Sequence, residues 1–390
     1  MKHLIRLTTI SAILAVCISG AWCQTNYKTL AQNAVNDVMG HFWSTSTSST
    51  AGYIQYTYGG LITTQSNRVL WEHATLYIAM ENVWEGTGNT TLQQQLLADW
   101  LHCYPQYSGQ TITSCGSGKT SPAQDDAAWD CFLMIKAYNA TGNATALADA
   151  QTLANNMFNR WYDSAIGGGM WYSDSKAIKS LYQAASVLDY LKLYEITGTK
   201  SYLTHALLCY TWLEKKMLRT DGLYWCDNNA VSGIVGLSTP YAIQQAGSVT
   251  FLGGNMAMGV IHARLYKDLG DDIYRQRALR TATALRTYLT DTNGVYVDDR
   301  DAWTDGMFAG EWAREVLTLP GTAPGDVQIL KNTASAVYTN DRESTGYYGG
   351  CWDGPVGTSG DVWSNGGSTP QQIMTSSEAI DIIAGAANLP

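Results

Sequence analysis

Two consecutive aspartates, Asp125 and Asp126, stand where an apolar helical pattern begins, in the segment SPAQDDAAWDCFLMIKAYNATGN (121–143). Ser121 and Pro122 disfavour an earlier helix, so the two acids should lie in the first helical turn. Side chains of adjacent helical residues point about 100° apart and can therefore flank one bond. Retaining glycoside hydrolases use two carboxyl groups about 5 to 5.5 Å apart, one as nucleophile and one as acid/base. The pair therefore indicates glycosidic-bond chemistry.

The same two acids have a simpler interpretation as helix-capping groups. Negative side chains are stabilising near a helix N-terminus, where the backbone dipole is positive. The sequence is compatible with both interpretations, and they do not exclude each other. Trp129, one turn after Asp125, could form one wall of a sugar site, and we take it as a candidate substrate-binding residue.

Aromatic residues of the kind that bind sugars gather in a Gly-rich segment, GGGMWY (167–172). The chain has 24 Tyr and 14 Trp against 5 Phe, and Tyr and Trp combine a flat apolar face with a hydrogen-bond donor. The glycines would allow the backbone to approach a ligand closely. Trp171 and Tyr172 are therefore candidate substrate-binding residues. The alternative is that both rings only pack against neighbouring helices.

A second aromatic cluster occurs in DGLYWCD (221–227). Its candidate substrate-binding residues are Asp221, as a hydrogen-bonding group, and Trp225, as a stacking surface. The alternative is a purely structural turn that is stapled through Cys226.

Composition and charge limit the class of partner. The formal net charge is −9, and the calculated pI of about 5.1 argues against nucleic acid, which selects a basic surface. The sequence has neither CxxC nor HxxxH spacing, no Gly-rich phosphate loop, and no nucleophile elbow with a matching triad. We therefore expect no metal and no cofactor, and we expect a monomer.

The N-terminal segment has the pattern of a secretory signal peptide. Lys2 and Arg6 precede an apolar run from about residue 10 to 18, and small residues follow at 19–21. The run is too short to span a membrane, and no other stretch could do so. We predict a signal peptide over 1–23 and one catalytic domain over 24–390. The mature protein should be secreted, or periplasmic in a bacterial host.

The cysteine content favours disulfides in an exported protein. Two of the eight cysteines belong to the signal region, and an even number therefore remains. The remaining cysteines are Cys103, Cys115, Cys131, Cys209, Cys226 and Cys351. Cys103–Cys115, which would close a short polar loop, is the pairing that we favour. The other pairings stay open.

A helical repeat organises the chain. Four segments each contain an amphipathic run, a glycine turn and a second amphipathic run, with apolar intervals of three and four that predict one buried stripe in each arm. The turn glycines are Gly88, Gly142, Gly198 and Gly270. Further helices are predicted over 27–42, 307–319, 326–338 and 371–387. A period of 55 to 70 residues with long connections favours a closed (α/α) toroid over a tetratricopeptide-type solenoid, whose period is about 34 residues.

Two blocks of the sequence carry a family resemblance. DDAAWDCFLMIKAYNATGN, together with NRWYDSAIGGGMWYSDSKAIKS, resembles glycoside hydrolase family 76, the endo-α-1,6-mannanases. The resemblance extends over about 27–388 and implies an all-α (α/α)6 barrel that hydrolyses α-1,6-mannosidic bonds of mannan with retention. It further implies Asp125 as nucleophile, Asp126 as acid/base, and Lys179 as the family's lysine, a candidate substrate-binding residue.

The sequence departs from the family pattern at three places. Asp130 stands where a second aromatic residue is usual, Ser180 replaces an asparagine, and Phe-Leu at 251–252 replaces Tyr-Asn. These changes should alter sugar contacts more than catalysis. Glu72 and Glu81 follow a helical pattern, and either could supply a third carboxylate near the cleft.

Two rival functions remain compatible with the sequence. One is a transglycosidase of the fungal cell-wall type, which would transfer a mannosyl-linked anchor to wall glucan. The other is a non-catalytic mannan-binding protein, since residues of the expected cleft depart from the family pattern.

Overall fold

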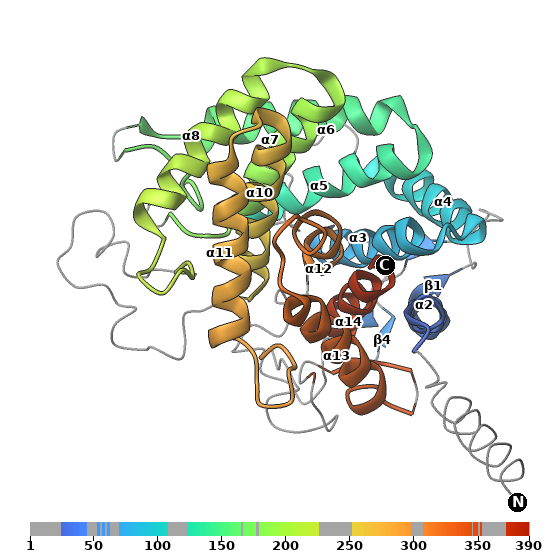
Figure 1. Ribbon diagram of the computed structural model, residues 1–390. Coiled ribbons are helices and arrows are strands. Elements are labelled where there is room, and N and C mark those ends of the chain that lie inside the picture. The colour runs from blue at the N-terminus through green and yellow to red at the C-terminus, as the bar shows by residue number, and fades with distance from the viewer. Residues whose placement is uncertain are drawn as a thin grey trace, which may run out of the picture.

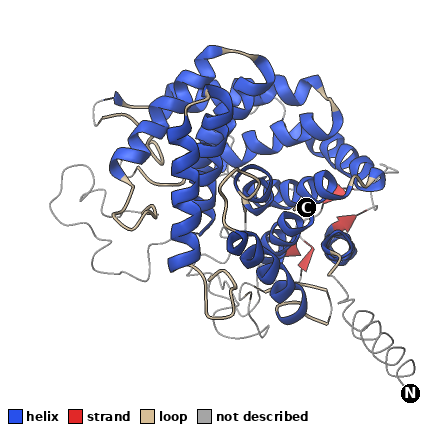
Figure 2. Cartoon of the chain, in the orientation of Figure 1, coloured by secondary structure: helices blue, strands red, loops and turns tan. Residues whose placement is uncertain are grey.

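The computed structural model places the helices in two concentric layers around one axis (Figures 1 and 2). The residues that it describes are 25–44, 53–54, 57–58, 61–62, 70–107, 123–164, 167–176, 179–225, 252–297, 307–344, 346–349, 352 and 372–389. The predicted signal peptide lies outside these ranges.

Within the described ranges, six helical pairs follow one another around the ring. The pairs, inner member first, are α3 (Leu70–Thr87) with α4 (Thr90–Tyr107), α5 (Gln124–Thr141) with α6 (Ala144–Trp161), α7 (Gln183–Thr197) with α8 (Lys200–Lys216), α10 (Leu252–Leu269) with α11 (Asp272–Tyr288), α12 (Ala309–Glu311) and the π-helical turn η4 (Trp312–Val316) with α13 (Pro324–Asn340), and α14 (Gln372–Ala387) with α2 (Tyr27–Phe42). The helix predicted over 27–42 is confirmed, whereas the one predicted over 307–319 is shorter than expected.

The inner helices form a closed ring. Each packs against the next, and the C-terminal helix α14 packs against α3 and α2, so that the two ends of the folded chain meet (Figure 1). The all-α toroid predicted from the repeat is therefore confirmed. The described residues also include two antiparallel pairs of two-residue strands, β1 (Trp43–Ser44) with β2 (Tyr53–Ile54) and β3 (Thr57–Tyr58) with β4 (Leu61–Ile62).

Burial distinguishes the two layers. The outer helix α6 buries a single stripe, at intervals of three and four residues: Ala146, Ala150, Leu153, Ala154, Met157 and Trp161. The inner helix α7 instead buries every residue from Gln183 to Leu193. The prediction of one buried stripe thus holds for this outer arm and fails for the inner arm, because an inner helix contacts neighbours on all sides.

Short glycine turns fix the direction of the hairpins. Gly88, Gly142, Gly198 and Gly270 all have positive φ, between 67° and 71°, as predicted for helix C-caps. The inner helices α3, α5, α7 and α10 therefore each end at a tight turn and start at a long connection. The N-termini of the inner helices consequently lie at the same end of the ring as the long loops.

The cysteines provide a correction. Cys131 and Cys209 are buried thiols outside any disulfide, and Cys131 donates to the carbonyl of Ala150 at 3.5 Å. These two do not take part in the disulfides that the even cysteine count suggested, because both side chains are packed as ordinary core, Cys131 on the inner helix α5 and Cys209 on the buried stripe of the outer helix α8. The predicted Cys103–Cys115 bridge lies outside the described side chains.

A glycine in α14 allows the ring to close tightly. A Cβ at Gly385 would lie 2.7 Å from the carbonyl oxygen of Ala309, whereas a Cβ at Gly40 on α2 would meet nothing within 4 Å. Gly385→Ala should lower the free energy of unfolding by about 1 to 3 kcal/mol, since backbone cannot yield cheaply. Gly40→Ala, the matched control, should raise it by up to about 1 kcal/mol. Urea denaturation measures both, and equal effects would contradict the tight contact.

Candidate active site

The aspartate pair lies in the first turn of the inner helix α5. Asp126 is 5% exposed, and Asp125 is partly exposed. The N-cap residue Ala123 has no side-chain cap, and the Oδ1 atom of Asp125 accepts the N–H of Asp126 at 2.9 Å. The geometry agrees with the capping interpretation for Asp125. It also places both acids at the end of the ring where the inner helices begin.

The Gly-rich loop adjoins the start of α5. The N–H of Gln124 donates to the carbonyl of Tyr172 at 2.7 Å, and Ala123 forms an antiparallel bridge with Ser173. The structure therefore brings together the two sequence blocks that carry the family resemblance.

The two aromatic residues of this loop have different surroundings. Trp171 is 8% exposed, and its Nε1 atom donates to Asp163 Oδ2 at 3.0 Å. Tyr172 is partly exposed, and its ring lies tilted against that of Tyr182, with centroids 6.1 Å apart. Tyr172 therefore keeps surface for a ligand, whereas Trp171 mainly packs.

Trp129 belongs to an aromatic layer beneath the acids. Its ring stacks on Phe308 with centroids 5.2 Å apart and meets the edge of Phe132 at 6.4 Å. Only 6% of Trp129 is exposed. This leaves little of the side chain for the sugar contact that the sequence suggested.

Lys179 is placed differently from the prediction. It has no exposed surface, and its ammonium donates to backbone carbonyls of the Gly-rich loop. In this structure Lys179 has no surface for contact with a sugar. Its neighbour Ser180, one of the departures from the family pattern, is buried as well.

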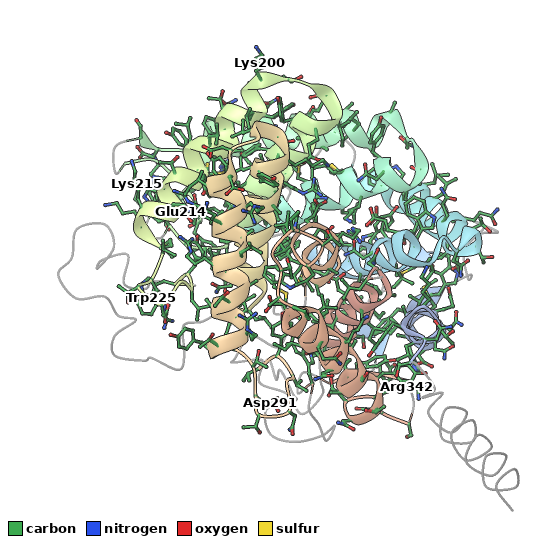
Figure 3. All side chains as sticks on the ribbon, in the orientation of Figure 1. Lys200, Glu214, Lys215, Trp225, Asp291 and Arg342 are labelled. Carbon is green, nitrogen blue, oxygen red and sulfur yellow. The ribbon has the colours of Figure 1, made fainter. Side chains whose placement is uncertain are left out.

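Asp221 and Trp225 lie on a separate turn after α8. Asp221 pairs with Arg219 at 2.6 Å and accepts the N–H of Leu223 at 3.1 Å. The guanidinium of Arg219 lies 4.3 Å from the centroid of the Trp225 ring. Figure 3 shows Trp225 at the periphery of the molecule, beyond the end of α8. The backbone is tied to the inner ring through Asn255 on α10, which accepts the N–H of Tyr224 at 2.8 Å.

Deeper in the ring, inner helices contribute a fully buried ionic cluster that sequence reasoning did not identify. Lys136 on α5 pairs with Glu81 and with Glu311, each at 2.6 Å, and all three side chains are unexposed. The ammonium of Lys192 on α7 lies 3.8 Å from Glu311. Glu81 thus belongs to this cluster rather than to the expected cleft. The sequence did contain one signal for this cluster, namely charged residues in inner-helix segments that have no continuous polar face to expose.

An aromatic ring separates the ionic cluster from the acids. The ammonium groups of Lys136 and Lys192 lie 5.6 Å and 5.0 Å from the centroid of Phe132. Lys136 follows Asp126 by ten residues, which corresponds to about 15 Å along the helix. Along the axis of the ring, the two acids are therefore followed by an aromatic layer and then by an ionic layer.

Comparison with known families decides the classification. The model of the family described as Glycosyl hydrolase family 76 matches residues 26–379. The chain belongs to glycosyl hydrolase family 76. A comparison with curated proteins finds no significant match.

Solved structures of family 76 enzymes and of one fungal protein share the fold. An inactive variant of the α-1,6-mannanase from Salegentibacter sp. HEL1_6, in complex with alpha-1,6-mannotetrose, is 17% identical with a TM-score of 0.70, covering 94% of this chain and 100% of that chain. A family 76 glycoside hydrolase from a bovine Bacteroides thetaiotaomicron strain is 16% identical with a TM-score of 0.74, covering 93% and 78%. Dfg5 from Chaetomium thermophilum is 14% identical with a TM-score of 0.69, covering 95% and 92%. The likeness confirms the (α/α)6 toroid.

Within the described residues, no helix has the length and apolar character needed to cross a membrane. Among those same residues, no group of three or more His, Cys, Asp or Glu side chains is placed to hold a metal ion.

Proposed function

We propose that this family 76 glycoside hydrolase is an exported, monomeric endo-enzyme that cleaves α-1,6-mannosidic bonds of mannan with retention of configuration. The observation that carries the proposal is the placement of Asp125 and Asp126 at the start of α5, hydrogen-bonded through Gln124 to the Gly-rich loop. In the Salegentibacter α-1,6-mannanase, the inactive variant has two consecutive aspartates replaced by alanine.

The two acids take separate roles in a double displacement. Asp125 attacks the anomeric carbon while Asp126 protonates the departing glycosidic oxygen, and Asp126 then activates the water that hydrolyses the glycosyl-enzyme. Asp125 accepts a backbone N–H at the positive end of the α5 dipole, and both interactions stabilise a carboxylate. Tyr172 supplies partly exposed aromatic surface beside the pair for a mannose ring.

Stereochemistry tests the mechanism. Proton NMR of α-1,6-mannotetraose during hydrolysis should show the α-anomer of the new reducing end first, with the β-anomer growing in later by mutarotation. Initial release of the β-anomer would mean that water attacks directly, and the nucleophile assignment of Asp125 would be wrong.

A transglycosidase of the fungal cell-wall type is the second candidate, and a solved fungal structure shares the fold. The structure of Chaetomium thermophilum Dfg5, which contains glucosamine, covers nearly all of this chain. Incubation of a mannosyl donor with a glucan acceptor, followed by mass spectrometry, separates the two activities. Mixed donor–acceptor products that exceed hydrolysis products would select transfer. Saturable binding to mannan without any product would instead select a binding protein.

A further inference from the structure

Lys179 stands out because its buried ammonium is surrounded by carbonyl oxygens. Its Nζ atom lies 3.0 Å from the carbonyl of Asp163, 2.6 Å from that of Gly168 and 2.9 Å from that of Gly169. An ammonium has three N–H donors and no acceptor, so every donor is used. All three carbonyls belong to the connection between α6 and α7. The ammonium therefore closes this loop on itself.

The glycines give the loop a shape that needs a cation. Gly167, Gly168 and Gly169 have φ values of 87°, 104° and 80°, in a region that other residues rarely adopt. This backbone turns two adjacent carbonyls towards one point, where their negative ends repel each other. A positive charge at that point removes the repulsion.

Two indole rings cover the ammonium. Its Nζ atom lies 4.8 Å from the centroid of Trp171 and 5.8 Å from that of Trp212 on α8, within the range of cation–π attraction. Because the rings and the carbonyls fill its surroundings, Lys179 has no exposed surface. Nothing in this arrangement is left to bind a substrate.

The loop in turn is bonded to the helix that carries the acids. Next to the Lys179 contacts, the carbonyl of Tyr172 accepts the N–H of Gln124 on α5 at 2.7 Å. The N–H of Met170 donates to Oε1 of Gln183, the first residue of α7, at 2.9 Å. We propose that Lys179 is a positioning residue, whose ammonium holds the Gly-rich loop against the start of α5 and so fixes Asp125 and Asp126 for catalysis. This inference rests on the proposed function.

We call the Lys179 ammonium and the three carbonyls that it contacts the clamp. The clamp should respond to pH in a defined direction. Burial lowers the pKa of Lys179 to about 8, although the carboxylate of Asp163 opposes this; the thiol of Cys209 on α8 and the ammonium of Lys176 are the other ionisable groups that act on it. Burial raises the pKa of that thiol to about 12, so it stays neutral. A neutral amine has two N–H donors for three carbonyls. Activity should therefore fall as pH rises through about 8.

The contribution of Lys179 to global stability should instead rise as pH rises. Because the pKa of Lys179 in the folded protein is below its ordinary value, the unfolded chain binds more protons between about pH 8 and about pH 10.5. The contribution of this group to the free energy of unfolding therefore rises with pH in that window. A role confined to stability would not make activity fall there.

Lys179→Met tests the proposal, with Lys176→Met as the matched control. Lys176 is exposed and precedes Lys179 by three residues. The kcat on α-1,6-mannotetraose is measured against pH, and amide hydrogen exchange is followed in segments 123–127 and 167–173. Exchange needs no substrate, so it tests the clamp even if wild-type protein fails to cleave mannan and the proposed function falls.

We expect Lys179→Met to lower kcat at about pH 7 by about 10- to 100-fold, with faster exchange in both segments. Wild-type protein and Lys176→Met should keep slow exchange and lose about tenfold more kcat between about pH 7 and about pH 9 than Lys179→Met does, since the need for a protonated acid is common to all three proteins. Unchanged exchange at 123–127 in Lys179→Met, or the same alkaline loss, would overturn the proposal. Should that variant not fold, wild-type exchange in the two segments must itself accelerate above about pH 8, corrected for intrinsic rates, or the proposal is wrong.

Discussion

Asp125→Asn and Asp126→Asn are each expected to lower kcat on α-1,6-mannan by about 100- to 10,000-fold while leaving the protein folded. Asparagine keeps an oxygen that can accept the N–H now bonded to Asp125. It supplies neither a nucleophilic carboxylate nor a proton donor of the required acidity. Initial rates of reducing-end release, with unfolding temperatures for the same samples, measure the two effects separately.

Asp272→Asn is the matched control for helix capping. Asp272 lies in the first turn of the outer helix α11, with its side chain 50% exposed. Its loss should lower stability only slightly and leave the activity unchanged. If the Asp125 and Asp126 variants behaved like this control, active but somewhat less stable, the pair would serve only as helix caps.

Lys136→Met is expected to destabilise the fold by about 3 to 5 kcal/mol, a large part of the about 5 to 15 kcal/mol that typical proteins have. Burial opposes ionisation of Glu311, but the charges of Lys136, Arg314 and Lys192 outweigh it and hold its pKa well below the usual range. Removing Lys136 therefore leaves a buried carboxylate short of its closest cation, which is 2.6 Å away. Chemical denaturation followed by circular dichroism measures the loss.

Two further variants serve as controls for the Lys136→Met prediction. Lys267→Met removes a lysine whose side chain is 62% exposed and 4.0 Å from Glu195, so it should change stability by less than about 1 kcal/mol. Adding Glu311→Gln to Lys136→Met should recover part of the lost stability, because the buried carboxylate is then removed together with its cation. A loss for Lys136→Met no larger than that for Lys267→Met would contradict the ionic cluster.

Local rules were enough to predict the hairpins from the sequence. The glycine turns have the predicted left-handed conformation, and Asn89, Asn143 and Asp271 each accept N–H groups at the start of the next helix. The position of the acid pair on α5 followed from the same signals. Such features depend on residues within a few positions of one another, which a single sequence contains.

The rest depends on contacts between distant segments. Lys179 was a candidate sugar-binding residue because the family resemblance implies that it is the family's lysine after the Gly-rich loop. Its actual partners are carbonyls that only the folded glycine run brings together. In the same way, nothing near Lys136 in sequence shows that Glu311, 175 positions later, lies beside it. Burial decides the role of both lysines, and burial is a property of the closed ring.

We propose that the Asp125–Asp126 pair makes this protein a mannan hydrolase, and product chromatography tests this proposal most directly. Wild-type protein and the variant carrying both asparagine substitutions are incubated with linear and with branched α-1,6-mannan. Wild-type protein should release short α-1,6-mannooligosaccharides from the linear polymer, and the double variant should release none while still binding it. Saturable binding by wild-type protein without any released sugar, or equal release by the double variant, would contradict the claim.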